Sequence, residues 1–446
     1  MRFRQHLATA VATISVMTFA AVAQTGEVLW KFDLSNISGA FVTVAADGTI
    51  YTVDWDRLWA INPNGTVKWT FEDAGAAGGL SVAGSGQPVA LLPDGRIVVA
   101  AGHTIWALHT DGTVAWSFSW DGGFKNQIDN GPGIGPDGNI YATTALNDGF
   151  GLGVFSLTPD GELRWQDEPD PTMIILNASH NQRVRFTQTR LIFGFVNTSG
   201  SQAVYAYDFD GSQTNFIDYT CLSSPRTDEV DRLLLAGVCG LQAIDLETDS
   251  ILWTVGLGPV NMTPIAGSDG VVYSGNWHGS ISAIDPQGQI LWTSPEVGLQ
   301  RTLAVSDEHG MFLYAGENFG EPNWFGAVDI TSGQELFSIP FETVSGHNEL
   351  GWSNEAAFSP DGRIAYFTTR FTSNGTSGRL YAVRIADGEA ACPADLDSSG
   401  DVGINDFLGL LAAWGLNPGH PADLDGDDVV GITDLLQLLA TWGPCP

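Results

Sequence analysis

Residues 269–294 read DGVVYSGNWHGSISAIDPQGQILWTS. The stretch begins with an Asp-Gly pair and continues as three short apolar segments separated by polar turns that contain glycine. Apolar and polar residues alternate with a period of two within these segments, which is typical of half-buried β-strands. Asp-Gly pairs supply the positive φ angles that tight hairpin turns require. The stretch therefore predicts three short strands joined by tight turns.

The same pattern returns along almost the whole chain, and each copy ends in an aromatic residue. These anchor residues are Trp69, Trp116, Trp165, Phe216, Trp253, Trp292 and Phe337. Successive anchors are roughly 40 to 50 residues apart, which is about the length of one four-stranded sheet. The first strand of each sheet fits the segment before each Asp-Gly pair, for example 261–266 or 355–358. Repeats of this kind are typical of the blades of a β-propeller.

The last copy begins at Asp361 and ends after the turn at Asp387 and Gly388 without its aromatic strand. Residues 26–32, GEVLWKF, match the missing strand. An N-terminal strand that completes the last blade removes the exposed sheet edges that invite aggregation. The sequence therefore predicts an all-β, eight-bladed β-propeller closed by the N-terminal strand. Seven blades is the alternative, because the unit ending at Phe216 is degenerate.

The blades share an Ala-x-Asp segment that is followed by a turn glycine and, four residues later, by Trp. This pattern resembles the tryptophan-docking motif of pyrroloquinoline-quinone-type propellers over about residues 26–390. That superfamily includes quinoprotein dehydrogenases and non-enzymatic outer-membrane assembly lipoproteins, and the resemblance implies that Trp locks neighbouring blades together. Quinoprotein dehydrogenases usually hold their cofactor under a ring of two adjacent cysteines, which this sequence lacks. We therefore expect no quinone cofactor and no enzymatic site inherited from the family.

Residues 1–23 have the features of a secretory signal peptide. Arg2 and Arg4 precede an apolar run that starts at Leu7, and residues 21–23 form a small-residue cleavage site. The run is shorter than a membrane-spanning helix requires. The formal net charge of −33 argues against nucleic acid or an anionic membrane as a partner. We expect a secreted bacterial protein, extracellular or at the cell surface, with no membrane span.

Export also allows disulfides to form among the four cysteines. Cys221 and Cys239 lie in one predicted blade, whereas Cys392 and Cys445 flank the C-terminal segment. We predict one disulfide within each couple.

Composition changes at Cys392, which predicts a propeller domain over 24–391 and a second domain over 392–446. Two copies of one pattern follow, PADLDSSGDVGINDFLGLLAAWG from Pro393 and PADLDGDDVVGITDLLQLLATWG from Pro421. Oxygen-bearing side chains occupy the ligand positions of a calcium loop, including position 12: Asp395, Asp397, Ser399, Asp401 and Asp406, then Asp423, Asp425, Asp427 and Asp434. Calcium takes six to eight oxygen ligands, with position 7 giving its backbone carbonyl. The pattern predicts two Ca²⁺ sites, each followed by an apolar helix over 407–414 or 435–442.

An EF-hand would have Glu at position 12 and a helix before the loop. Here position 12 is Asp, and Pro393 or Pro421 precedes the loop, so no entering helix is expected. Paired loop-helix repeats of this kind resemble a dockerin over about residues 392–446. The resemblance implies two bound calcium ions and attachment to a cohesin-like or cell-surface protein. Ser399 departs from the Asp or Asn usual at position 5.

The most site-like stretch of the propeller is 345–355, which leads into the inner strand of the last blade. It contains His347, Glu349, Trp352 and Glu355. A second polar stretch, 124–130, contains Lys125, Asn126, Gln127, Asp129 and Asn130. These stretches predict a polar pocket for a glycan or peptide, with ordinary loop chemistry as the alternative. Catalysis of glycoside hydrolysis by the two glutamates would require carboxyl groups roughly 5–10 Å apart.

The sequence favours a secreted, non-catalytic binding or adaptor propeller. A calcium-dependent dockerin would attach it to a cohesin-bearing or cell-surface assembly. The alternative is an extracellular enzyme, either a quinone-dependent sugar or alcohol oxidoreductase or a polysaccharide-degrading hydrolase. The blade motif bears on architecture and is weak evidence for chemistry.

Overall fold

A computed structural model describes most of the chain from residue 26 onward. The described residues are 26–35, 41–54, 57–72, 81–82, 85–86, 89–101, 104–119, 126–146, 152–170, 184–196, 202–219, 226–228, 232–237, 240–248, 250–258, 263–276, 278–316, 323–344, 347–351, 355–371, 377–386, 394–397, 399, 401–416, 420–424 and 429–444. The chain forms two compact units, one of Thr25–Ala386 and the other containing Asp387–Pro446. Among the described residues, no helix has the length and apolar content to cross a membrane.

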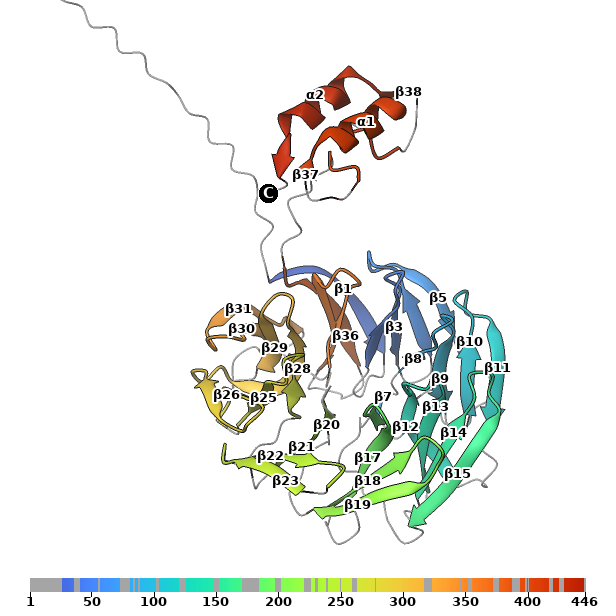
Figure 1. Cartoon of the computed structure of the whole chain (residues 1–446). Helices are drawn as coiled ribbons and strands as arrows, with labels where there is room; N and C mark the ends of the chain where they lie inside the picture. Colours follow the sequence, from blue (N-terminus) through green and yellow to red (C-terminus); the bar gives the residue numbers. More distant parts are fainter. Residues whose placement is uncertain are drawn as a thin grey trace, which may run out of the picture. The chain divides into compact units, whose positions relative to one another are not determined.

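The larger unit is a ring of antiparallel sheets (Figure 1). Seven of them are four-stranded blades whose strands follow one another in sequence. Blades 1 to 3 consist of β2 (Val42–Val44), β3 (Ile50–Val53), β4 (Leu58–Ile61) and β5 (Val67–Phe71); β8 (Ala90–Leu91), β9 (Ile97–Ala101), β10 (Thr104–Leu108) and β11 (Val114–Ser119); and β12 (Asn126–Ile134), β13 (Ile140–Leu146), β14 (Leu152–Leu157) and β15 (Leu163–Asp170). A two-stranded hairpin, β6 (Ser81–Val82) and β7 (Ser85–Gly86), precedes β8.

Blades 4 to 7 repeat this plan. They consist of β16 (Arg185–Phe186), β17 (Arg190–Val196), β18 (Gln202–Asp208) and β19 (Gln213–Tyr219); β20 (Arg226–Thr227), β21 (Arg232–Gly237), β22 (Gly240–Asp245) and β23 (Ser250–Val255); β24 (Ile265–Ala266), β25 (Val272–Gly275), β26 (Ile281–Ile284) and β27 (Ile290–Thr293); and β28 (Leu299–Ser306), β29 (Met311–Gly316), β30 (Trp324–Asp329) and β31 (Glu335–Pro340). The degenerate unit that ends at Phe216 thus forms a blade of its own, β16–β19.

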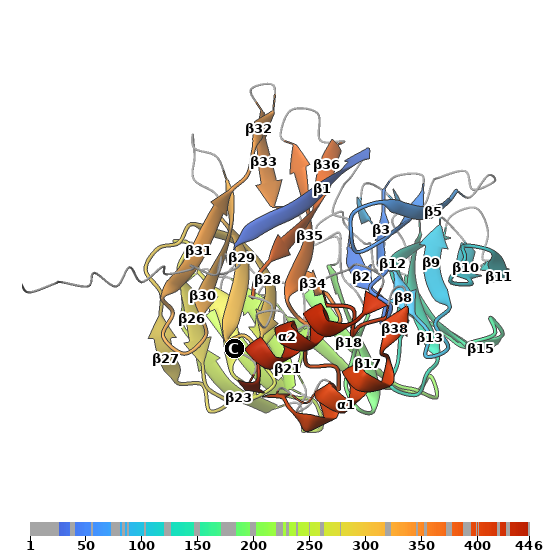
Figure 2. The same cartoon turned by 90° about the horizontal axis from the view of Figure 1, so that it is seen from above.

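Blade 8 joins the two ends of the propeller. It contains β32 (Thr343–Val344), β33 (His347–Gly351), β34 (Ala357–Phe358), β35 (Ile364–Phe371) and β36 (Ser377–Arg384), with the N-terminal strand β1 (Glu27–Ser35) as its outer strand. β1 pairs antiparallel with β36 from Glu27 opposite Arg384 to Ser35 opposite Ser377. Figure 2 shows β1 lying along β36. The prediction of eight blades closed by the N-terminal strand is confirmed, and the seven-blade alternative is wrong.

The core of the propeller lies between neighbouring blades. Tyr51 and Val53 of blade 1, for example, pack against Ile97 and Val99 of blade 2, and all four are buried. Alternate residues of a strand face opposite sides of the sheet. Each blade therefore contributes side chains from its two faces to the clusters that it shares with its two neighbours. Burying one aliphatic side chain of this size stabilises the fold by about 1.5–3 kcal/mol. Each blade therefore depends on both of its neighbours.

A tryptophan of each standard blade also packs on a turn of the next blade. Trp69 of blade 1 donates its indole N–H to the carbonyl of Thr110 at 2.8 Å, and its ring lies against Gly112. Gly112 has φ +86°, and a Cβ atom there would be 2.8 Å from the indole. Equivalent N–H bonds run from Trp30 to Pro63, Trp116 to Pro159, Trp165 to Phe209, Trp253 to Pro286 and Trp292 to Ile330. The ring also closes this way, because Trp30 of β1 contacts Gly65 of blade 1.

The junction between blades 4 and 5 uses a different donor. The side chain of Phe216 lies outside the described residues, and the sequence of the receiving segment, 245–250, contains no glycine. Arg190 of blade 4 donates its Nη1 to the carbonyl of Leu246 at 2.6 Å, which is the carbonyl that an indole reaches at the other junctions. A guanidinium thus supplies the hydrogen bond between these blades. A cavity of about 460 Å³ beside it is lined by residues that include Thr187, Arg190 and Leu246.

In its described residues, the smaller unit contains two helices and two short antiparallel pairs of strands. They are α1 (Ile404–Ala412), α2 (Ile432–Ala440), β37 (Asp401–Val402) paired with β40 (Gly443–Pro444), and β38 (Gly415–Leu416) paired with β39 (Val429–Val430). Both helices begin three residues earlier than predicted. The reason is that Asp406 and Asp434 lie in the first turn, where each accepts the N–H of the capping glycine, Gly403 at 2.7 Å and Gly431 at 2.6 Å.

Several predicted features fall on residues outside the described part of the chain. They are the signal peptide over 1–23 and all four cysteines, Cys221, Cys239, Cys392 and Cys445. The signal peptide and both disulfides therefore stay predictions.

The close contact between Trp69 and Gly112 predicts that one added methyl group at Gly112 lowers the free energy of unfolding strongly. We expect Gly112→Ala to destabilise the propeller by more than the roughly 1–2 kcal/mol that a left-handed backbone costs a non-glycine residue. The excess arises because Trp69 must move away from the new Cβ. Urea denaturation followed by tryptophan fluorescence measures the change.

Gly95→Ala is the matched control, because Gly95 has the same φ of +86° and its Cβ would meet only Thr110 Cγ2 at 3.8 Å. Equal losses in the two variants would show that backbone strain, and not indole docking, makes the glycine necessary.

Candidate functional sites

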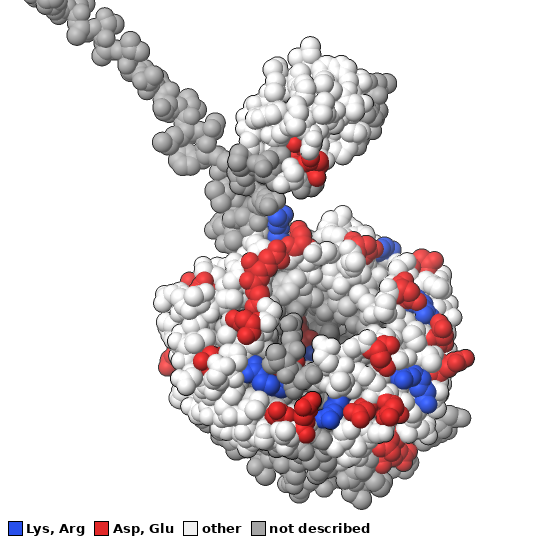
Figure 3. Space-filling model, viewed as in Figure 1, with Lys and Arg blue, Asp and Glu red and all other residues white. Residues whose placement is uncertain are grey.

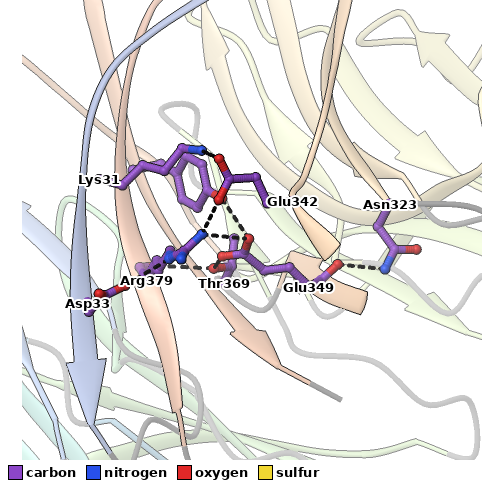
Figure 4. Close-up of polar contacts among 8 residues, drawn as sticks. Lys31, Asp33, Asn323, Glu342, Glu349, Thr369 and Arg379 are labelled. Atoms are coloured by element: carbon purple, nitrogen blue, oxygen red, sulfur yellow. Dashed lines mark hydrogen bonds and ion pairs between the residues drawn. The ribbon is translucent and has the colours of Figure 1, made fainter. Parts of the chain in front are cut away.

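A buried carboxylate lies in blade 8 beside the strand that closes the ring (Figure 4). Glu349 of β33 is 1% exposed. Its two carboxylate oxygens accept hydrogen bonds from Thr369 Oγ1 and from Tyr381 OH, the latter at 2.7 Å. Its backbone carbonyl accepts a hydrogen bond of 2.6 Å from Asn323 Nδ2. Both carboxylate oxygens are thus satisfied inside the fold.

A network of charged residues lies on one side of the Glu349 carboxylate. Arg379 Nη1 lies 3.7 Å from Glu349 Oε2, and the same guanidinium pairs with Glu342 and Asp33, each at 2.8 Å. Lys31 Nζ lies 2.6 Å from Glu342 Oε1 and 5.3 Å from the centre of the Tyr381 ring. Because Lys31 and Asp33 belong to β1, the network connects the closing strand to β33 and β36. This arrangement supports a structural role for Glu349.

Burial raises the pKa of Glu349 above its ordinary value of 4.5, and this effect outweighs the hydrogen bonds from Thr369 and Tyr381 and the charge of Arg379. The neighbouring Glu342 behaves in the opposite way. Hydrogen bonds from Lys31 and Arg379 lower the pKa of Glu342 below 4.5. The two carboxyl groups of one network thus have pKa values shifted in opposite directions.

Glu355 belongs to a different set of contacts. It forms an ion pair with Arg185 of β16, with both side chains about one-fifth exposed. Arg185 is in blade 4 and Glu355 precedes the inner strand of blade 8, so the pair connects opposite sides of an eight-bladed ring. Glu349 and Glu355 therefore have different partners, and the described contacts do not assemble them as a glycosidase acid and base.

The two predicted propeller stretches contribute backbone to β12 and β33. The side chains of His347, Trp352, Lys125, Asn126, Gln127, Asp129 and Asn130 lie outside the described residues. Sequence reasoning missed Arg185. The sequence feature that could have identified it is a charged residue next to Phe186, in the segment that forms the inner strand of the least regular repeat.

The ring encloses a central cavity of about 430 Å³. Its walls come from the inner strands of blades 1 to 5, and the lining residues are Thr43, Val89, Ala90, Leu91, Pro132, Gly133, Ile134, Val184, Arg185, Phe186 and Thr227. Figure 3 shows the propeller hollowed at its centre. Arg185 is the charged member of this lining. Cavities of this size are suitable for small-molecule ligands.

The C-terminal unit brings together three of the predicted calcium ligands. Carboxylate oxygens of Asp395, Asp397 and Asp406 all lie within 4.8 Å of one another, and Asp406 is buried. Asp395 and Asp397 both accept the N–H of Ser399, at 3.0 and 3.1 Å, which curls the loop around the cluster. Three mutually close carboxylates repel one another unless a cation lies between them. The donor set of hard oxygen atoms fits Ca²⁺.

The second loop has the same anchor. Asp434 is buried and accepts the N–H groups of Leu424 at 2.7 Å and Gly431 at 2.6 Å. Asp423 is described, whereas Asp425, Asp427 and the side chain of Asp401 lie outside the described residues. Position 12 is therefore buried in both copies and accepts the N–H of the glycine three residues before it.

Both helices of this unit expose apolar side chains at equivalent positions. The two sets are Ile404, Leu408, Leu411 and Trp414, and Ile432, Leu436, Leu439 and Trp442. Their exposed fractions lie between 41% and 70%. The opposite helix face forms the small core, with Leu410 and Leu438 fully buried. Large exposed apolar groups on a small unit are typical of a protein interaction surface.

A family model described as outer membrane protein assembly factor BamB matches residues 16–238 and 239–404. The chain belongs to this family. The match covers the whole propeller, and membership identifies the blade architecture and not the chemistry. No curated protein matches the chain.

Solved structures with the same fold have diverse functions. A europium-containing methanol dehydrogenase superposes with a TM-score of 0.57 at 13% identity, covering 80% of this chain and 93% of the enzyme. Quinohemoprotein alcohol dehydrogenase from Comamonas testosteroni gives 0.55 at 13% identity, covering 83% and 80%. The C-terminal WD40 domain of Sif2 gives 0.54 at 12% identity, covering 81% and 99%. At these identities the likeness shows the fold alone.

The raised pKa of Glu349 predicts a specific dependence of stability on pH. The folded protein binds a proton at Glu349 more tightly than the unfolded chain, so ionisation of this group favours unfolding. Relative to Glu349→Gln, the wild-type free energy of unfolding should fall as the pH rises from 4.5 through the folded-state pKa. Urea denaturation of both proteins across this range measures the difference.

Glu342→Gln is the control with the opposite sign. Because the pKa of Glu342 is lowered, its stabilising effect is present above 4.5 and is lost as the pH falls through the folded-state pKa. A difference between wild type and Glu349→Gln that does not change with pH would contradict the raised pKa.

Proposed function

We propose that this protein is a secreted bacterial binding or adaptor protein without catalytic activity. Its propeller presents a ligand-binding surface, and its C-terminal unit is a calcium-dependent dockerin-like module that attaches it to a cohesin-like or cell-surface protein. The observation that carries the proposal is the geometry of the module. Buried Asp406 and Asp434 anchor two equivalent loops, and each following helix exposes an apolar face.

Calcium would be held by the carboxylates of each loop. Asp395, Asp397 and Asp406 would serve the first site, with Ser399 and the backbone of Asp401, and Asp423, Asp425, Asp427 and Asp434 would serve the second. The ion supplies positive charge that offsets the repulsion among these carboxylates. Each position-12 carboxylate caps its helix, so metal binding and helix formation are coupled through one side chain. A unit this small gains much of its folding free energy from bound ions.

The exposed helix faces suit an apolar protein partner. Ile404, Leu408 and Leu411 follow one stripe of α1, and the equivalent residues follow one stripe of α2. Burial of these side chains in an interface would be worth about 25 cal/mol for each Å² removed from water. A cohesin-like partner with an apolar sheet surface fits this face. The formal net charge of −33 supports a protein or glycan partner over nucleic acid.

We expect the full chain to bind two Ca²⁺ ions, and we expect chelation to unfold the C-terminal helices while the propeller stays folded. Calorimetric titration counts the ions, and far-ultraviolet circular dichroism follows the helices. Asp406→Asn should remove one of the two binding events. Asp111→Asn is the matched control, because Asp111 lies in an exposed propeller turn. Helix signal that survives chelation unchanged would contradict the calcium dependence.

The exposed apolar residues of α1 and α2 predict that charged substitutions there weaken partner binding. We expect the full chain to bind a cohesin domain in calcium, and the double variant Leu408→Asp, Leu436→Asp to bind at least tenfold more weakly because charges replace exposed apolar contacts. Surface plasmon resonance with the immobilised cohesin measures both. The matched control is Val67→Asp with Val114→Asp, which alters exposed apolar residues of the propeller. Equal binding by both double variants would exclude this helix face.

Two enzymatic alternatives remain distinct from this proposal. One is an oxidoreductase, because solved structures with this fold include two alcohol-oxidising dehydrogenases. Calorimetric binding of pyrroloquinoline quinone, with substrate-dependent dye reduction on sugars or alcohols, would replace the adaptor function with that activity. Turnover of a polysaccharide would replace it with a hydrolase.

A further inference from the structure

The central cavity has the features of a small-molecule site. Its volume is about 430 Å³, and its lining combines apolar side chains with a few polar groups. Val89, Leu91 and Ile134 supply apolar surface, whereas Thr43, Thr227 and Arg185 supply polar groups. A lining with few polar groups fixes the orientation of a ligand through those groups.

The two threonines are oriented by bonds to neighbouring strands. Thr43 Oγ1 donates to the carbonyl of Val89 at 2.7 Å, and Thr227 Oγ1 donates to the carbonyl of Phe186 at 2.9 Å. A hydroxyl group has one proton and two acceptor lone pairs. Because each proton is used in the wall, each oxygen can accept a hydrogen bond from a hydroxyl group of a ligand. Gly133 packs closely against Phe186 in this wall, since a Cβ at Gly133 would lie 2.8 Å from the Phe186 ring.

Arg185 adds a cation to this lining. Its guanidinium offers planar donors that match a carboxylate. In the structure its partner is the carboxylate of Glu355, which comes from the opposite blade. Both side chains keep about one-fifth of their surface exposed, so water reaches the pair. A ligand carboxylate can take the place of Glu355 on the guanidinium, and water then solvates the partly exposed carboxylate of Glu355.

We propose that the central cavity binds a small hydroxylated organic acid of the sugar-acid class. Arg185 recognises its carboxylate in exchange for Glu355, and the oxygens of Thr43 and Thr227 accept from its hydroxyl groups. The inference rests on the proposed binding role of the propeller and specifies the class of ligand. It is independent of the calcium module, so the two can fail separately.

The experiment is calorimetric titration of the full chain with d-galacturonate, with d-galactose as the neutral analogue of the same ring. We expect binding of the acid and at least tenfold weaker binding of the neutral sugar. Arg185→Gln should weaken binding of the acid at least tenfold. Glu355→Gln should tighten it severalfold, because it removes the internal carboxylate that competes for Arg185.

Arg96→Gln is the matched control. Arg96 pairs with Asp94 and Asp160 at a propeller turn, so its loss should leave binding unchanged. Equal binding of the acid and the neutral sugar, or failure of both wild type and Glu355→Gln to bind the acid, would overturn the proposal. If Arg185→Gln does not fold by circular dichroism, the Glu355→Gln comparison decides alone, and unchanged or weaker binding by that variant would overturn the proposal. The calcium titration of the same samples shows whether the C-terminal module is intact.

Discussion

The propeller depends on the contact between an indole ring and the glycine turn of the next blade. The contact combines three requirements in one place: a positive φ, the absence of Cβ, and a carbonyl that accepts the indole N–H. Trp69 and Gly112 meet all three, and the same combination recurs around the ring. Six of the eight junctions between described blades have this contact, and the one from Trp30 to blade 1 forms only when the N-terminal strand closes the ring.

Two junctions between blades depart from this contact. At the boundary of blades 7 and 8, Phe337 packs on Gly26 with its ring, and a phenyl ring offers no N–H. At the boundary of blades 4 and 5, Arg190 supplies a hydrogen bond to Leu246 without an indole. Apolar contact and hydrogen bonding can thus be provided separately. The blade that departs most from the repeat is also the one that sends Arg185 into the central cavity, so loss of regularity coincides with chemical specialisation.

Two neighbouring glutamates illustrate the limits of a sequence motif. Glu349 and Glu355 are close in the chain and were grouped in one predicted site. Glu349 instead joins the polar network that connects β1 with β33 and β36, where Tyr381 and Arg379 contact it. Glu355 pairs with a residue 170 positions away in the chain. A polar stretch in a loop indicates that side chains are available, but the strands that receive them decide what each one does.

The sequence by itself determined the blades and the closure of the ring by 26–32, and it singled out Asp395, Asp397 and Asp406, whose carboxylates lie together. These features depend on local rules: a period of two, the φ of glycine, and the ligand spacing of a short loop. Only the tertiary structure decided that Asp406 and Asp434 cap their helices from the first turn, that Arg190 replaces an indole, and that Arg185 meets Glu355 across the ring. Those contacts join residues through packing, and local patterns carry no information about partners that lie several blades apart.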